Sequence, residues 1–191
     1  VVKRDRRVYR YFHLPVQSGS DKVLKAMGRK YTVDEYRELV RKIRRVLGET
    51  TFIATDIIVG FPGEEEEDFW ATVKLAEELQ FDKIHVARFS PRPFTEAAVM
   101  PRQVPDVEKK RRSKVLSEIS LKIAHVRNGL RVGTKDEVLI DEIDHGLVVG
   151  RASDYRQVVM RRGAHRELLG NFTNVRIVGA GPIYLFGEVI E

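Results

Sequence analysis

The protein has 191 residues, 42% of them hydrophobic, and no run of about 18 apolar residues, so we expect a folded chain without a membrane span or signal peptide. Its 34 lysines and arginines exceed its 28 aspartates and glutamates, and the resulting net charge of +6 permits polyanion binding without requiring it. It has no cysteine, which excludes disulfides, thiolate nucleophiles and cysteine-held iron–sulfur clusters on this chain.

The first fifty residues predict one strand and two helices. Residues 9–16 are typical of a short strand, and Ser20 is placed to cap a helix that runs to about Gly28. Thr32 followed by Glu35 predicts a capping box, which opens a second helix that ends at Gly48. The apolar residues of this second helix recur at helical spacing and are Tyr36, Leu39, Val40, Ile43, Val46 and Leu47.

Two further strands flank a third helix. Thr51–Val59 is a nearly continuous apolar run, typical of a strand covered on both faces. A turn at Gly60–Gly63 and an acidic helix start follow, and Phe81–Phe89 is the next strand. The expected buried residues of the helix are Phe69, Trp70, Val73, Ala76 and Leu79. Strands that alternate with helices indicate a parallel sheet, but three strands neither close a barrel nor shield both edges.

The remaining residues predict a long helix and a second domain. Residues 105–128 form the helix, with an apolar stripe of Val115, Leu116, Ile119, Ile123 and Val126. Beyond Gly129, short alternating runs separated by glycines predict a small closed β-barrel. These runs are residues 137–141, 147–151, 157–160, 174–178 and 183–190. We therefore expect three parts, namely residues 1–103, 104–128 and 129–191.

Polar or glycine-rich segments follow each predicted strand. Gln17 and Ser18 suit polar contact with a ligand, but the loop equally suits capping of the next helix, through Ser18 or Ser20. The glycines at 60 and 63 allow a ligand close to the backbone, but a plain strand-to-helix turn needs them too. Arg88, Ser90 and Arg92 either contact a nucleotide target or, through the arginines, pair with the acidic residues 64–67.

Three further groups, His13, Asp56 and His85, fall within predicted strands. Imidazole and carboxylate groups bind metals and act as acids or bases when they meet. Polar residues in the middle of a strand are more typical of a structural role, however. The sequence therefore predicts no metal site and no catalytic residue on this chain.

The predicted barrel carries a cluster of arginines, all within residues 151–166 and accompanied by one tyrosine. Arginine pairs with phosphate and stacks on bases, so the cluster predicts an RNA-binding face. Its members are Arg151, Tyr155, Arg156, Arg161, Arg162 and Arg166. The alternatives are a solvated arginine face and a barrel that only docks on another domain.

Three segments resemble the later part of the radical S-adenosylmethionine (SAM) domain of the tRNA methylthiotransferases. They are residues 13–20 (HLPVQSGS), 55–64 (TDIIVGFPGE) and 85–93 (HVARFSPRP). Residues 129–191 resemble the TRAM domain, the small RNA-binding β-barrel that ends those enzymes. The first segment, preceded by residues 9–12 (YRYF), is most similar to the archaeal and eukaryotic type, which methylthiolates threonylcarbamoyladenosine beside the anticodon.

This resemblance implies an α/β fold: the carboxyl-terminal half of a (β/α)6 radical SAM barrel, a connecting helix and a TRAM barrel. It implies that one group of residues contacts SAM, namely Gln17, Ser18, Val59, Gly60, Phe61 and Pro62. It places Arg88, Ser90 and Arg92 on the substrate side. Family enzymes carry SAM and two 4Fe–4S clusters, but their cluster cysteines are missing here.

We therefore expect a piece of a cytoplasmic parent enzyme that binds no cluster and is inactive alone. Its expected partners are tRNA, the amino-terminal cluster-binding region of the parent and a second copy through the open sheet edge. One alternative is a stand-alone RNA-binding module without catalysis. Another is an unrelated α/β enzyme that uses His13, Asp56 and His85.

Overall fold

The computed structural model describes residues 8–144, 147–161 and 168–190. The chain divides into two units. The first, the sheet unit, consists of residues 13–43 and 53–123. The second, the barrel unit, consists of the described parts of residues 1–12, 44–52 and 124–191. Each unit is organised around a hydrophobic cluster of its own.

A three-stranded sheet has the order β1-β2-β3, with β1 at Tyr11–His13, β2 at Phe52–Val59 and β3 at Lys83–Arg88. The expected parallel arrangement is confirmed, with Asp56 of β2 opposite His85 of β3. β1 is shorter than the predicted residues 9–16, because the Val16 N–H donates to the Thr55 hydroxyl and not to a carbonyl of β2. Pairing resumes as a single parallel bridge between Gln17 and Ile57.

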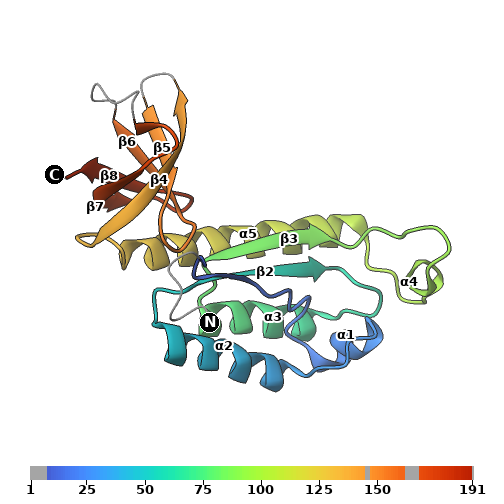
Figure 1. The fold of residues 1–191 in the computed structure, drawn as a ribbon. Helices are drawn as coiled ribbons and strands as arrows, with labels where there is room; N and C mark the ends of the chain where they lie inside the picture. The colour runs from blue at the N-terminus through green and yellow to red at the C-terminus, as the bar shows by residue number, and fades with distance from the viewer. Residues whose placement is uncertain (1–7, 145–146, 162–167, 191) are drawn as a thin grey trace. The chain divides into compact units, whose positions relative to one another are not determined.

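The helices are α1 (Asp21–Ala26), α2 (Val33–Leu47), α3 (Glu66–Leu79), the short α4 (Glu96–Val99) and α5 (Asp106–Gly129). The two predicted caps are confirmed: Ser20 accepts from the Val23 N–H, and Thr32 and Glu35 bond reciprocally. Figure 1 shows α2 and α3 on the same side of β2. Side chains of α2, α3 and α5 pack against alternate residues of the strands, among them Ile53, Ile57, Val59 and Ile84.

Burial in the sheet unit is more one-sided than the sequence pattern indicates. Trp70, expected inside, is 47% exposed, and Leu39, which keeps the apolar spacing of α2, is 45% exposed. Trp70 follows the fully buried Phe69, and neighbouring helix positions lie about 100° apart, so only one of the two faces the core. In β2, Asp56 and Ile58 are only half-buried. The helices thus cover one face of the strand, not both.

The expected closed barrel is confirmed, with strand order β4-β5-β6-β8-β7. The strands are β4 (Lys135–Asp144), β5 (Leu147–Arg151), β6 (Gln157–Arg161), β7 (Phe172–Ala180) and β8 (Leu185–Val189). Inward residues such as Val138, Val158 and Leu185 are fully buried. Closure is tight at Gly187, where an added Cβ would lie 2.5 Å from a Val175 methyl carbon.

Across the described ranges, no helix combines the length and the apolar character needed to cross a membrane.

Candidate functional site

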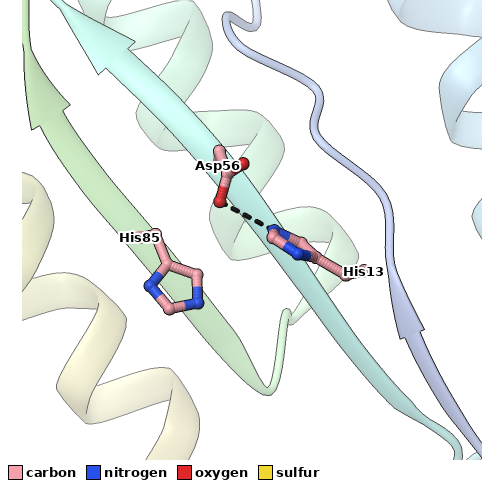
Figure 2. A group of neighbouring side chains, drawn as sticks. All are labelled: His13, Asp56 and His85. Carbon is pink, nitrogen blue, oxygen red and sulfur yellow. Dashed lines mark hydrogen bonds and ion pairs between the residues drawn. The ribbon is translucent and has the colours of Figure 1, made fainter.

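His13, Asp56 and His85 come from three adjacent strands and lie on the sheet face opposite the hydrophobic core (Figure 2). The side chains of a strand alternate between its faces, so the buried Thr55 and Ile57 direct Asp56 to the other side. His13 and His85 are exposed and Asp56 is half-buried. The sequence pattern indicated separate structural groups, whereas the tertiary structure brings the three residues together.

The three side chains are within reach of one another. His13 Nε2 and Asp56 Oδ1 are hydrogen bonded at 2.7 Å, and the rings of His13 and His85 have centroids 5.5 Å apart. One possible ligand atom from each residue can be chosen so that the three lie within 4.8 Å of one another. Partial burial, helped by the positive charge of Lys83, lowers the pKa of His85, while Asp56 opposes the shift. Such a group is equipped to bind a cation or to exchange a proton.

The loop after β1 is occupied by structural contacts. Ser18, predicted to contact SAM, is fully buried, and its hydroxyl lies 3.4 Å from that of Thr72 in α3. Ser20 caps α1 and also donates to Asp68 at 2.7 Å. Gln17 adopts a φ of +69° and joins the β2 ladder through its backbone. The helix-capping interpretation is therefore confirmed for Ser20.

The turn after β2 also packs within the protein. Gly60 has a φ of +76°, and a Cβ there would lie 2.3 Å from the side chain of Lys109 in α5. Its N–H donates to Glu64, which pairs with Arg112 at 2.6 Å. Burial raises the pKa of Glu64, although both of these partners act to lower it. The group that lies close to the Gly60 backbone is thus the Lys109 side chain.

The predicted SAM contacts on either side of Gly60 are buried as well. Val59 is 1% exposed, and Phe61 is 6% exposed and meets Phe89 edge-to-face at a centroid distance of 5.1 Å. Pro62 is likewise buried. The residues predicted to contact SAM are therefore gathered near the carboxyl ends of β1 and β2, but mostly below the surface.

The third strand end is open. Arg88, Ser90 and Arg92 all lie at least partly exposed there. The alternative expectation, that these arginines pair with residues 64–67, does not agree with the described ion pairs of that acidic segment. Glu64 pairs with Arg112, while Glu66 pairs with Arg111 and Arg112. The strand-end arginines are thus accessible from solvent.

On the barrel unit, Arg151 and Tyr155 form an aromatic and basic surface. The guanidinium of Arg151 lies 5.3 Å from the ring centroid of Tyr155, which is 46% exposed. Tyr9 and Tyr11 contact the same ring edge-to-face at centroid distances of 5.1 and 5.5 Å. Sequence reasoning did not include these two tyrosines, although their alternation around Arg10 places them on one face of an extended segment.

Arg156 is placed differently from the other predicted RNA contacts. It is 3% exposed and pairs with Asp154, which also pairs with Arg131. Its guanidinium donates to Asn128 Oδ1 at 2.9 Å and to the Thr50 carbonyl at 3.1 Å. Arg156 thus links the segments of the barrel unit that contain Thr50, Asn128 and Asp154. Arg161 ends β6, while Arg162 and Arg166 lie outside the described residues.

Known proteins resemble this chain. Residues 4–76 match the family described as the Radical SAM superfamily. A tRNA-2-methylthio-N(6)-dimethylallyladenosine synthase of Dictyoglomus thermophilum is 43% identical over 194 residues, which cover 100% of this chain and 43% of that protein. A probable threonylcarbamoyladenosine tRNA methylthiotransferase of Pyrococcus horikoshii is 42% identical over 188 residues, covering 98% of this chain and 43% of that protein.

A third relative, a tRNA-2-methylthio-N(6)-dimethylallyladenosine synthase of Endomicrobium trichonymphae, is 39% identical over 190 residues. The match covers 100% of this chain and 45% of that relative. The chain therefore spans less than half the length of these curated relatives. The family resemblance drawn from the three sequence segments is confirmed.

Proposed function

We propose that this chain, which belongs to the radical SAM tRNA methylthiotransferase family, takes part in adding a methylthio group to C2 of a modified adenosine in tRNA. The observation that carries the proposal is similarity along nearly the whole chain to relatives named for this kind of activity. The fold supports a division of work. The parallel sheet would be the later half of a radical SAM barrel, and the closed barrel would be a TRAM domain that binds tRNA.

The proposed cofactors of the parent enzyme are SAM and two 4Fe–4S clusters. This chain does not fit a cluster, because its 191 residues include no cysteine to ligate iron. We therefore assign no step of the radical chemistry to its residues, and we propose that a cluster-binding region of the parent is its partner. Purified alone, the chain should neither bind iron–sulfur clusters nor release 5′-deoxyadenosine from SAM. Release of 5′-deoxyadenosine by the chain alone would contradict this assignment.

For SAM, the proposal retains the predicted contacts Gln17, Ser18 and residues 59–62 as one edge of the pocket. Their position near the carboxyl ends of β1 and β2 supports it, since ligands of parallel α/β sheets bind at that edge. The burial of Ser18 and Val59 limits what their side chains offer. We therefore propose that SAM contacts only those parts of this edge that face the surface. Arg88, Ser90 and Arg92, at the open end of β3, would then lie toward the nucleotide substrate.

We propose that the adenosine carries a threonylcarbamoyl group, because the segment at residues 9–20 is most similar to that type. Relatives named for threonylcarbamoyladenosine and for dimethylallyladenosine are 42% and 43% identical, so overall identity does not separate the two. Deletion of the gene in its host, followed by mass spectrometry of tRNA nucleosides, separates them. We expect loss of the 2-methylthio derivative of threonylcarbamoyladenosine. Loss of the dimethylallyl derivative would overturn the substrate, and loss of neither would overturn the function.

RNA binding is proposed for the surface formed by Arg151 and Tyr155, together with the predicted contacts Arg161, Arg162 and Arg166. Tyr155 is 46% exposed, and stacking of one base on it is worth roughly 1–3 kcal/mol. Arginine contacts to phosphate should make binding fall steeply with added salt. Arg156 contributes indirectly here, because its buried contacts hold the segment that carries Tyr155.

Fluorescence anisotropy of labelled tRNA titrated with the whole chain tests this surface. Tyr155→Ala should weaken binding by about 5- to 150-fold, equivalent to roughly 1–3 kcal/mol. The double variant Arg161→Ala/Arg162→Ala should weaken binding and reduce its salt dependence. Arg176→Ala is the control, because it removes one positive charge from an exposed position on β7, and it should leave the affinity nearly unchanged. Unchanged affinity in the first two variants would exclude this surface.

The cytoplasm is the proposed location, in keeping with tRNA-modifying relatives.

A further inference from the structure

The strand ladder places His13, Asp56 and His85 side by side. Asp56 and His85 are direct partners in the register of β2 and β3. Two hydrogen bonds hold residues 14–17, the segment after β1, next to β2. Thr55 Oγ1 donates to the Leu14 carbonyl at 2.8 Å, and the Gln17 N–H donates to the Asp56 carbonyl at 2.9 Å. The backbone positions of the three residues are therefore set by hydrogen bonds that do not involve their side chains.

The distances between the side chains suit a small cation. Tetrahedral coordination with bonds of about 2.0–2.1 Å places ligand atoms roughly 3.3 Å apart. His13 Nε2 and Asp56 Oδ1 are 2.7 Å apart, and one ligand atom from each of the three residues lies within 4.8 Å of the others. Small rotations of side chains at an exposed face bring this set to the required separation. In Figure 2 the rings of His13 and His85 lie on either side of the Asp56 carboxylate.

The donor set selects a class of metal. Two imidazoles and one carboxylate suit zinc and neighbouring first-row divalent ions, whereas magnesium and calcium prefer oxygen ligands alone. Three protein ligands leave a coordination position for water or substrate. A hydrogen bond with a purely structural role would need only His13 and Asp56. His85 lies next to this pair on the same exposed face and supplies a third ligand. We propose that His13, Asp56 and His85 form a binding site for one divalent transition-metal ion, and Zn²⁺ is the ion used to test it.

This proposal does not depend on the proposed function. The metal would be held by His13, Asp56 and His85 of this chain, and not by the cysteines that hold the clusters of the parent enzyme. Calorimetric titration of the metal-free chain with ZnCl₂ should give one saturable site with a dissociation constant well below about 1 mM. His13→Ala and His85→Ala should each lower the affinity at least tenfold. Asp56→Asn, which keeps the side-chain shape and removes the charge, should also lower it. Circular dichroism of each variant checks that it is folded.

The other histidines of the chain provide matched controls. His125 is exposed on α5, and His125→Ala should leave zinc binding unchanged. The double variant His145→Ala/His165→Ala removes the remaining two of the five histidines and should also bind normally. In NMR spectra, Co²⁺ should shift or broaden the imidazole signals of His13 and His85 before those of His125. Zinc should raise the melting temperature of the wild-type chain by mass action.

Two results would overturn the proposal. One is the absence of saturable zinc binding below about 1 mM by the folded wild-type chain. The other is zinc affinity that survives in the double variant His13→Ala/His85→Ala, or that disappears in either control. Both results are independent of tRNA binding and of methylthiolation, so failure here leaves the proposed function in place.

Discussion

The sheet unit and the barrel unit each contain a group of three polar residues, and the two groups differ in their exposure. In the barrel unit, Arg131, Asp154 and Arg156 are at most 7% exposed, and both arginines pair with the aspartate. In the sheet unit, His13 and His85 are exposed and Asp56 is half-buried. The barrel closes on itself, so its strands have no free edge, whereas the sheet has β1 and β3 as open edges. The buried group stabilises its unit, whereas the exposed group is accessible to a ligand.

The first prediction tests this difference where it should be largest. Asp154→Ala leaves Arg131 and Arg156 buried without their shared carboxylate, and removal of one partner of a buried ion pair costs about 3–5 kcal/mol. We expect a loss of that size in the free energy of unfolding, measured by denaturant titration. Asp141→Ala is the control, because it breaks the half-exposed pair with Arg151 and should cost about 0–1 kcal/mol. Equal losses would show that the Asp154 pairs are not effectively buried.

A second, smaller effect is expected from the packing of the barrel. In Gly187→Ala the new Cβ would meet methyl groups of Val175 and Val158 at 2.5 and 2.8 Å, which should cost about 1–3 kcal/mol. Gly129→Ala, at the end of α5, meets nothing within 4 Å and should stabilise the chain by up to about 1 kcal/mol. Thermal unfolding checks that the melting temperature falls in Gly187→Ala and rises in Gly129→Ala. A stabilising Gly187→Ala would show that the barrel is loosely packed.

The third prediction concerns the acid stability of the sheet unit. Hydrogen bonds from Arg111, followed by those from Arg112, lower the pKa of Glu108 to about 2. A carboxylate with a lowered pKa stabilises the folded state at neutral pH, and this contribution is lost as the pH falls from about 4.5 to about 2. Glu108→Gln should therefore lose less stability than wild type over this range. Glu108 is only half-buried and Arg111 is exposed, so screening by solvent should limit the difference to about 0.5–1 kcal/mol.

Melting temperatures measured between pH 7 and pH 2.5 provide the comparison. Glu137→Gln, an exposed carboxylate on β4 in the barrel unit, is the matched control. A Glu108→Gln variant with the same acid dependence as wild type would contradict the assignment to this network.

The weakest expected effect arises from the open edges of the sheet. Unpaired strand edges invite pairing with another chain, so we expect weak, concentration-dependent self-association through β1 or β3. Light scattering over a range of protein concentrations measures it. A constant mass of 22.0 kDa throughout would remove this expectation.

Local signals predicted most of the secondary structure correctly. The cap at Ser20, the capping box at Thr32 and Glu35, and the glycine-separated runs of the barrel all depend on neighbours a few residues away. Trp70 was assigned to the core wrongly, because helical spacing indicates a face only approximately and the packing partners select its centre. The neighbouring Asp154 pairs with Arg156, but burial of Arg156 also requires Thr50 and Asn128, which are distant in sequence and gave no local signal.

Hydrophobic period, turn residues and motifs are local properties of a chain, and they were enough to predict the order of the main strands and helices, the closed barrel and the family resemblance. Which polar residues are accessible depends instead on contacts between segments that are distant in sequence. Parallel pairing across β1, β2 and β3 brought together His13, Asp56 and His85, which are 43 and 29 residues apart in sequence. Contacts between distant segments likewise placed Arg156 inside the barrel unit and left Tyr155 outside, although the two residues are neighbours.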